Sequence, residues 1–245
     1  VTFFTLGFGD VTPISALGRA LAVFEAGVGF GFLAIVIGYV PAIQGVFSER
    51  EALISMLDAR AGSPPVGSQI LIRMARSGSL HALDSFLGEW ERWCAKLLES
   101  VISFPVLGSY RSQHDNQSWL ASLTAILDAC ALSIAGATGT NTYQVQVTFA
   151  MARHAAVDLA MIYFTPPEPC AKRLDDARAR ELRAQLSSAG LEIDLDKLNE
   201  LREMYEPFVQ ALGNRLAYEV PPFLAPQSKA DNWQSSAWTK RVAGF

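Results

Sequence analysis

Hydrophobic residues gather in one long stretch near the start of the chain. Residues 16–47 contain only two charged side chains, Arg19 and Glu25, in an otherwise almost continuous apolar run. A helix needs about 20 apolar residues to cross a bilayer, because each residue advances the helix by about 1.5 Å. We therefore predict one transmembrane helix over residues 16–47, with Arg19 in its first turn reaching the outer headgroups.

The charges that follow this helix predict its orientation. Four arginines come within a short distance of its end: Arg50, Arg60, Arg73 and Arg76. Positively charged residues mark the cytoplasmic ends of membrane spans. The pattern predicts a cell-membrane protein with a single span in this sequence and a cytoplasmic C-terminal part.

Beyond a Gly- and Pro-containing break at residues 62–65, the pattern is that of amphipathic helices. Ser79, Asn116 and Asp194 precede apolar-periodic segments and are placed to cap three of these helices. The helices that we expect cover residues 79–103, 116–134, 143–164, 170–188 and 194–217.

Charged residues within these segments argue against further membrane spans. Asp128 interrupts the second helix, and Arg153, His154 and Asp158 interrupt the third. Intramembrane charges are costly, so a soluble helical bundle is the better interpretation. The charged run 172–176 is typical of a solvated helix face.

The expected fold is all-α, with one transmembrane helix followed by a cytosolic helical bundle. Its parts are residues 1–15 (the segment before the membrane helix), 16–47 (transmembrane helix), 48–78 (juxtamembrane linker), 79–220 (cytosolic helical domain) and 221–245 (irregular tail).

Composition limits the classes of function. The chain has 245 residues, of which 50% are hydrophobic, and its net charge of −4 gives no sign of nucleic-acid binding. Cys94, Cys130 and Cys170 lack metal-ligand spacing and are typical of reduced cytosolic thiols. Dinucleotide fingerprints, P-loops and EF-hand loops are absent after residue 50, so we predict neither an enzyme nor a bound cofactor.

The most informative motif is the run from Thr5 to Asp10, Thr-Leu-Gly-Phe-Gly-Asp, which stands directly before the long apolar segment. A dehydrated cation needs successive rings of oxygen ligands, which backbone carbonyls supply when every C=O faces one axis. Such a backbone alternates between ordinary and left-handed torsions, and Gly7 and Gly9 adopt positive φ without a Cβ clash.

This hexapeptide resembles the selectivity filter of potassium channels, on the two-helix pore module of the ion channel type 2 family. The resemblance implies that residues 1–15 are the end of a pore helix, the selectivity filter and its outer turn, and that residues 16–47 are the inner transmembrane helix. The resemblance implies that Thr5, Leu6, Gly7 and Phe8 bind K⁺ through their carbonyls, Thr5 also through its hydroxyl. It departs from the family at Phe4, where a second Thr is usual. It also departs at Leu6 and Phe8, which replace the commoner Val and Tyr, so selectivity for K⁺ over Na⁺ is expected to be weaker.

The resemblance also implies supporting roles around the filter. Gly9 and Asp10 would hold its outer mouth, and K⁺ would be the permeant ion rather than a cofactor. Glu25 would brace the filter from behind, although an interfacial carboxylate near the outer surface is an equal alternative. Gly29 lies where the family's inner helix carries its gating hinge, and plain helix packing explains this glycine equally well.

Taken together, these features predict the pore-forming subunit of a homotetrameric potassium-selective channel in a lipid bilayer. The sequence begins inside the expected pore helix, so we expect a fragment that lacks the first membrane helix and does not conduct alone. The alternative is a membrane-anchored interaction or sensor protein with a degenerate or non-selective cation pore. The cytosolic helical domain would bind a partner or ligand that the sequence does not identify.

Overall fold

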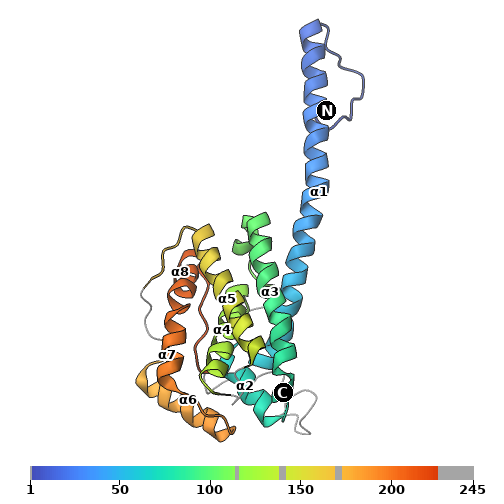
Figure 1. Cartoon of the computed structure of the whole chain (residues 1–245). Helices are drawn as coiled ribbons and strands as arrows, with labels where there is room; N and C mark the ends of the chain where they lie inside the picture. Colours follow the sequence, from blue (N-terminus) through green and yellow to red (C-terminus); the bar gives the residue numbers. More distant parts are fainter. Residues whose placement is uncertain (1, 114–115, 138–141, 169–172, 226–245) are drawn as a thin grey trace, which may run out of the picture. The chain divides into compact units, whose positions relative to one another are not determined.

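The computed structural model describes residues 2–113, 116–137, 142–168 and 173–225. It divides into two compact units, Val1–Ser48 and Glu49–Phe245. All regular secondary structure in the described residues is helical, which confirms the all-α prediction. Figure 1 shows the helices of both units.

The first unit consists of an N-terminal segment, in which we call residues 5–10 the ribbon, and most of the long helix α1 (Ala16–Ala61). The side chain of Ser15 accepts a hydrogen bond from the backbone N–H of Gly18 at 3.0 Å, which satisfies one of the free donors at the start of α1. The helix passes through Pro41 without a break and continues into the second unit.

The second unit contains the end of α1 and the remaining helices. Segment 48–78, which we expected to be a juxtamembrane linker, holds the end of α1 and all of α2. The helices after α1 are α2 (Gly67–Arg76), η1 (Leu80–Ala82), α3 (Leu83–Ser103), η2 (Pro105–Ser109), α4 (Trp119–Ile134), α5 (Tyr143–Ile162), α6 (Asp176–Ser188), α7 (Leu195–Glu203) and α8 (Glu206–Leu216).

Helix α4 forms the centre of this unit. Every residue from Trp119 to Ser133 is buried, as expected for a helix that is apolar on all sides. It packs against α2, α5, α7 and α8, while α3 packs along α5 (Figure 1). Gly67 permits the approach of α2, because a Cβ at this position would lie 2.6 Å from the carbonyl oxygen of Ala125. With 16 residues, α4 is also shorter than a membrane span.

The caps differ in part from the sequence predictions. Asp194 caps α7 by accepting hydrogen bonds from the backbone N–H groups of residues 196 and 197, as predicted. The prediction of Asn116 as a cap was wrong: Ser118 caps α4, and Asn116 has a φ of +62°. The predicted single helix 194–217 is two helices, because Pro207 stands in the first turn of α8 and cannot continue α7.

Candidate functional site

The ribbon before α1 has the alternating backbone that the motif predicts. Thr5, Gly7 and Gly9 have φ angles of +56°, +36° and +82°. Leu6 and Phe8, which lie between them, are not among the residues with positive φ. Alternation of this kind turns successive carbonyls toward one side of a strand-like segment, and glycine at two of the three positions removes the Cβ clash.

The side chains of this ribbon are exposed in the single chain. Leu6 is 63% and Phe8 is 74% exposed, and Thr5 and Asp10 are exposed as well. The single chain thus leaves the large apolar side chains of the ribbon uncovered.

Gly29 lies against the residue that leads into this ribbon. It is buried, and a Cβ at Gly29 would lie 1.6 Å from the carbonyl oxygen of Phe3. The ring of Phe3 also packs near that of Phe32, with centroids 6.1 Å apart. The absence of a side chain at Gly29 is thus what allows the chain before Thr5 to lie on α1.

Glu25 stands one helical turn before Gly29 in α1 and is exposed in the single chain. Residues four apart share a helix face, so Glu25 points to the same side as the contact between Gly29 and Phe3. A side chain that supports the ribbon through hydrogen bonds would have to lie on this side of α1. Its bracing role and the outer-mouth role of Asp10 stay predictions.

The surface of α1 in the first unit is apolar and uncovered. Only 6% of its most apolar 18-residue window is buried, whereas the core helix of a soluble protein is mostly buried. Ile35 and Ile37, for example, are 68% and 71% exposed. An apolar helix of this length without cover fits a lipid environment, which agrees with the sequence prediction of a span.

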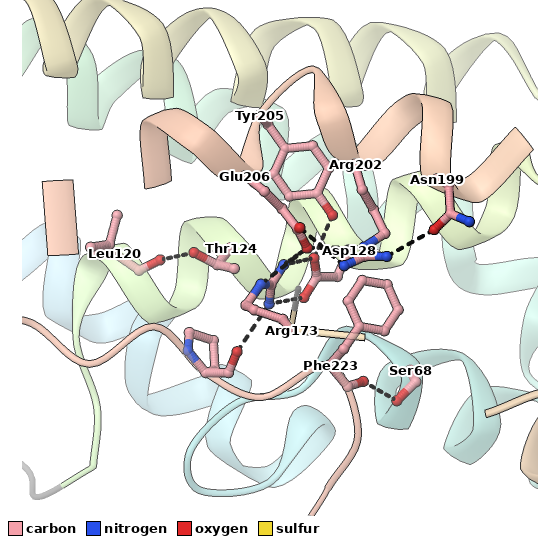
Figure 2. A network of polar contacts seen from close by, with 11 residues as sticks. Ser68, Leu120, Thr124, Asp128, Arg173, Asn199, Arg202, Tyr205, Glu206 and Phe223 are labelled. Atoms are coloured by element: carbon pink, nitrogen blue, oxygen red, sulfur yellow. Dashed lines mark hydrogen bonds and ion pairs between the residues drawn. The ribbon is translucent and has the colours of Figure 1, made fainter. Parts of the chain in front are cut away.

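The second unit contains a buried network of charged groups that the sequence interpretation missed (Figure 2). Asp128 in α4 is fully buried and accepts hydrogen bonds from Nη1 and Nη2 of Arg173, at 3.0 and 2.6 Å, and from the hydroxyl of Tyr205. Burial and the neighbouring charge of Asp128 raise the pKa of Tyr205 well above its ordinary value, so the phenol keeps its proton and donates.

Two arginines and two carboxylates balance one another in this network. Arg173 also contacts Glu206 at 2.9 Å, and Glu206 accepts hydrogen bonds from Nε and Nη2 of Arg202. Burial opposes the charged form of Arg173, but Asp128 and Glu206 more than offset this, so the pKa of Arg173 lies above its ordinary value. Each charge has an opposite partner, as buried ions require.

The network joins segments that are far apart in the sequence. Arg173 donates a further hydrogen bond to the carbonyl of Pro221 at 2.9 Å, and Ser68 in α2 donates to the carbonyl of Phe223 at 3.1 Å. The interpretation of residues 172–176 as a solvated face was wrong for Arg173, whose side chain is only 9% exposed. The signal that could have revealed the network is Asp128 itself, since an isolated charge in an apolar helix needs a partner.

A second buried arginine fixes the start of this unit. Arg50 donates hydrogen bonds to the carbonyls of Leu107 and Tyr110 at 2.8 and 2.9 Å, and to Glu51 at 3.0 Å. Its own carbonyl accepts a hydrogen bond from the indole N–H of Trp93 at 3.2 Å. The first turn of α1 in this unit is thereby held to η2 and α3.

Comparison with known families gives one match to the N-terminal part of the chain. Residues 1–43 match the family described as "Ion channel". Neither the curated proteins nor the solved structures include a significant match to the chain. The matched residues contain the ribbon, Glu25 and Gly29, and this match together with the uncovered apolar helix supports an ion-channel function in a membrane. Residues 1–43 are thus the part of the chain that is similar to ion channels, and the ribbon and Gly29 lie within it.

Proposed function

We propose that this chain supplies the pore-forming segment of a homotetrameric potassium-selective channel that transports K⁺ passively across the cell membrane. The observation that carries the proposal is the alternation of positive φ at Thr5, Gly7 and Gly9 directly before a membrane-length helix. The family match over residues 1–43 supports the assignment to ion channels in general.

In this proposal the carbonyl groups of Thr5, Leu6, Gly7 and Phe8 replace the water shell of the ion. Four copies around one axis give rings of four oxygens, and adjacent rings allow an ion to enter one site as another leaves. Gly9 and Asp10 hold the outer mouth, where the carboxylate attracts cations. The exposed side chains of Leu6 and Phe8 then pack away from the axis against neighbouring parts of the tetramer.

The supporting residues act on the position of the ribbon. Gly29 allows the carbonyl of Phe3 to lie against α1, which fixes where the filter starts. Glu25, one turn earlier on the same helix face, accepts hydrogen bonds from the back of the ribbon. The end of the inner helix is cytoplasmic, since arginines follow it.

The test is ion flux through the intact protein reconstituted in liposomes. Gly7→Ala places a Cβ at a φ of +36° and is expected to abolish Rb⁺ uptake. Gly45→Ala in α1, where a Cβ meets no atom within 4 Å, is the matched control and keeps uptake. Uptake by Gly7→Ala at the level of the control would refute the filter assignment.

The second candidate is a membrane-anchored interaction or sensor protein whose pore is degenerate. Phe4 in place of the usual Thr, together with Leu6 and Phe8, favours it, because these changes loosen the packing behind a filter. Oligomeric state separates the two candidates. A channel requires four subunits around one axis. A monomeric mass for the intact protein in detergent or nanodiscs would therefore refute the channel and favour the membrane-anchored protein.

A further inference from the structure

One end of the second unit carries most of its exposed large apolar side chains. They lie at the end of α3, at the end of α5 and just after it, and in η2 and the residue after it, and we call them the apolar rim. Its members are Ile102 (53% exposed), Val106 (44%), Tyr110 (42%), Met161 (66%) and Phe164 (92%). In the described part of this unit, the other exposed large apolar residues are Met56, Tyr143 and Met204.

The elements of the rim are held together by specific contacts. The hydroxyl of Tyr163 donates to the carbonyl of Pro105 at 2.7 Å, which joins the end of α5 to the start of η2. Gly108 makes room for this tyrosine, because a Cβ there would lie 1.8 Å from the hydroxyl oxygen. The rim is therefore one fixed surface of two helix ends and a short 3₁₀ helix.

Phe164 is the most exposed member of the rim, and its backbone is unusual. It follows α5 in the left-handed region with a φ of +53°. The N–H of Thr165 bonds to the carbonyl of Ala160 and the N–H of Phe164 to that of Met161, the pattern of a Schellman cap. Glycine is the ordinary residue at this position. The chain instead carries a large aromatic ring there and leaves it in solvent, which folding of the single chain does not explain.

Chain length limits how far the rim can lie from Phe47, where the apolar run of α1 ends. Arg50 donates to the carbonyls of Leu107 and Tyr110, the second of which is a rim residue. Arg50 comes three residues after Phe47, so at most about 11 Å of chain separates them. This bound follows from chain length alone and holds for any arrangement of the two units. The rim is thus within reach of the surface at which the apolar run ends.

We propose that the apolar rim inserts into the headgroup region of the bilayer beside the span and docks the second unit on the membrane surface. The proposal rests on the proposed function only in requiring α1 to cross a membrane. Aromatic and aliphatic side chains that project from a rigid surface partition into this region, and Tyr110 suits it because its ring is apolar and its hydroxyl is polar. The alternative is that a second copy of the chain, and not lipid, covers the apolar rim.

The test uses a fluorescent label whose quenching reports contact with lipid. Phe164→Cys and Val106→Cys place the NBD fluorophore on two elements of the rim. Tyr143→Cys is the matched control, since Tyr143 is an aromatic residue, 80% exposed, at the opposite end of α5, about 29 Å away for 20 helical residues. Ile35→Cys in the apolar part of α1 reports on the span.

The labels are specific because the native thiols in the described residues are inaccessible. Cys94 and Cys130 are buried, and burial raises the pKa of both thiols well above the ordinary value, which leaves little reactive thiolate. Cys170, which lies outside the described residues, is changed to Ser in every variant. The intact protein is reconstituted in phosphatidylcholine vesicles that contain a doxyl-labelled lipid quencher near the headgroups.

Quenching at positions 164 and 106 is expected to exceed that at position 143 by about threefold or more, because only the rim reaches the interface. Equal quenching at all three positions overturns the proposal. Rim labels that have blue-shifted emission but no lipid quenching overturn it as well, and assign the rim to contact between copies. The label at position 35 separates the proposed membrane span from the proposed docking of the rim. Absence of lipid quenching at position 35 contradicts the span. Lipid quenching at position 35 without quenching at position 164 contradicts only the docking.

Discussion

Substitution of Gly29 by alanine tests how α1 positions the ribbon. A Cβ at this position would lie 1.6 Å from the carbonyl oxygen of Phe3 and 2.6 Å from its carbonyl carbon. An ordinary contact between carbon and oxygen lies at about 3.3 Å or more, so the two backbones must separate by roughly 1.7 Å. Both atoms belong to the backbone of Phe3, and a rotamer change cannot relieve the clash.

The magnitude follows from the cost of overpacking. Inserting a methyl group into a closely packed site costs about 1–3 kcal/mol, which lowers the population of the native arrangement by roughly 5- to 150-fold. Helix propensity acts in the opposite direction, because alanine favours a helix over glycine by about 1 kcal/mol. A loss of function in Gly29→Ala therefore reports the clash and not the helix.

The assay measures Rb⁺ uptake and the ratio of K⁺ to Na⁺ permeability for the intact protein in liposomes. Phe3 lies two residues before Thr5, so displacement of its carbonyl is expected to lower both quantities. Gly27→Ala and Gly31→Ala are matched controls, because a Cβ at either position meets no atom within 4 Å in the chain. A pure hinge at Gly29 predicts a different pattern, in which uptake changes and the permeability ratio does not.

Equal behaviour of the three alanine variants would refute this reasoning. It would mean that the contact between Gly29 and Phe3 is unimportant for the ribbon in the assembled protein. Loss of uptake in Gly27→Ala or Gly31→Ala alone would point to helix packing between subunits instead, since Gly27 and Gly31 form a small-xxx-small pair.

Two further predictions concern the stability of the second unit, followed by tryptophan fluorescence of the intact protein in urea, with the buried Trp90, Trp93 and Trp119 as reporters. Asp128→Asn leaves Arg173 and Arg202 to share Glu206, and the lost buried charge is expected to cost about 3–5 kcal/mol. The control is Glu200→Gln, which breaks an exposed ion pair with Lys197 and is expected to leave the midpoint of urea unfolding almost unchanged. A similar unfolding midpoint for both variants would contradict the role of the network. Gly67→Ala forces α2 away from the backbone of α4 and is expected to cost about 1–3 kcal/mol. Gly88→Ala, whose Cβ would have only ordinary contacts with Gln144, is its control, and equal midpoints would show that α2 yields without cost.

The sequence pattern predicted those features of the helices and turns that depend only on residues close together in the chain. The end of α4 near Ile134 and the span of α5 follow from the apolar period and from the Gly-containing break after Ile134. The positive φ of Gly7 and Gly9 follows from the lack of a side chain. Such features depend on neighbouring residues only, so the sequence contains all the information that determines them.

Other features depend on choices that the sequence leaves open. Asn116 and Ser118 are both good capping residues two positions apart, and packing of Trp119 into the core selects the second. Pro207 is compatible with a turn after α7 and with the start of a new helix, and proline is favourable in the first turn that it occupies in α8.

The partners in the buried network could not be predicted from the sequence, because they lie far apart in the chain. Asp128 signals that it needs a partner, but its partners Arg173 and Tyr205 are 45 and 77 residues away in the sequence. Several other arginines would satisfy the same electrostatic requirement. Arg173 reaches Asp128 because Glu206 at the start of α8 and the backbone of Pro221 also hold its guanidinium, so the tertiary fold decides the pair.

Arg50 fixes the part of α1 that comes directly after the boundary between the two units. The two units are joined in the chain between Ser48 and Glu49, so any coupling through the chain passes the first turn that Arg50 holds. A hydrogen bond from a charged donor contributes about 1.5–3 kcal/mol, and Arg50 makes two of them to backbone carbonyls. A shift in a two-state population from 1:99 to 99:1 takes about 5.5 kcal/mol, which is comparable to the pair together. A change at η2 that broke both contacts would therefore alter the free energy with which α1 is held at Arg50 by an amount of this order.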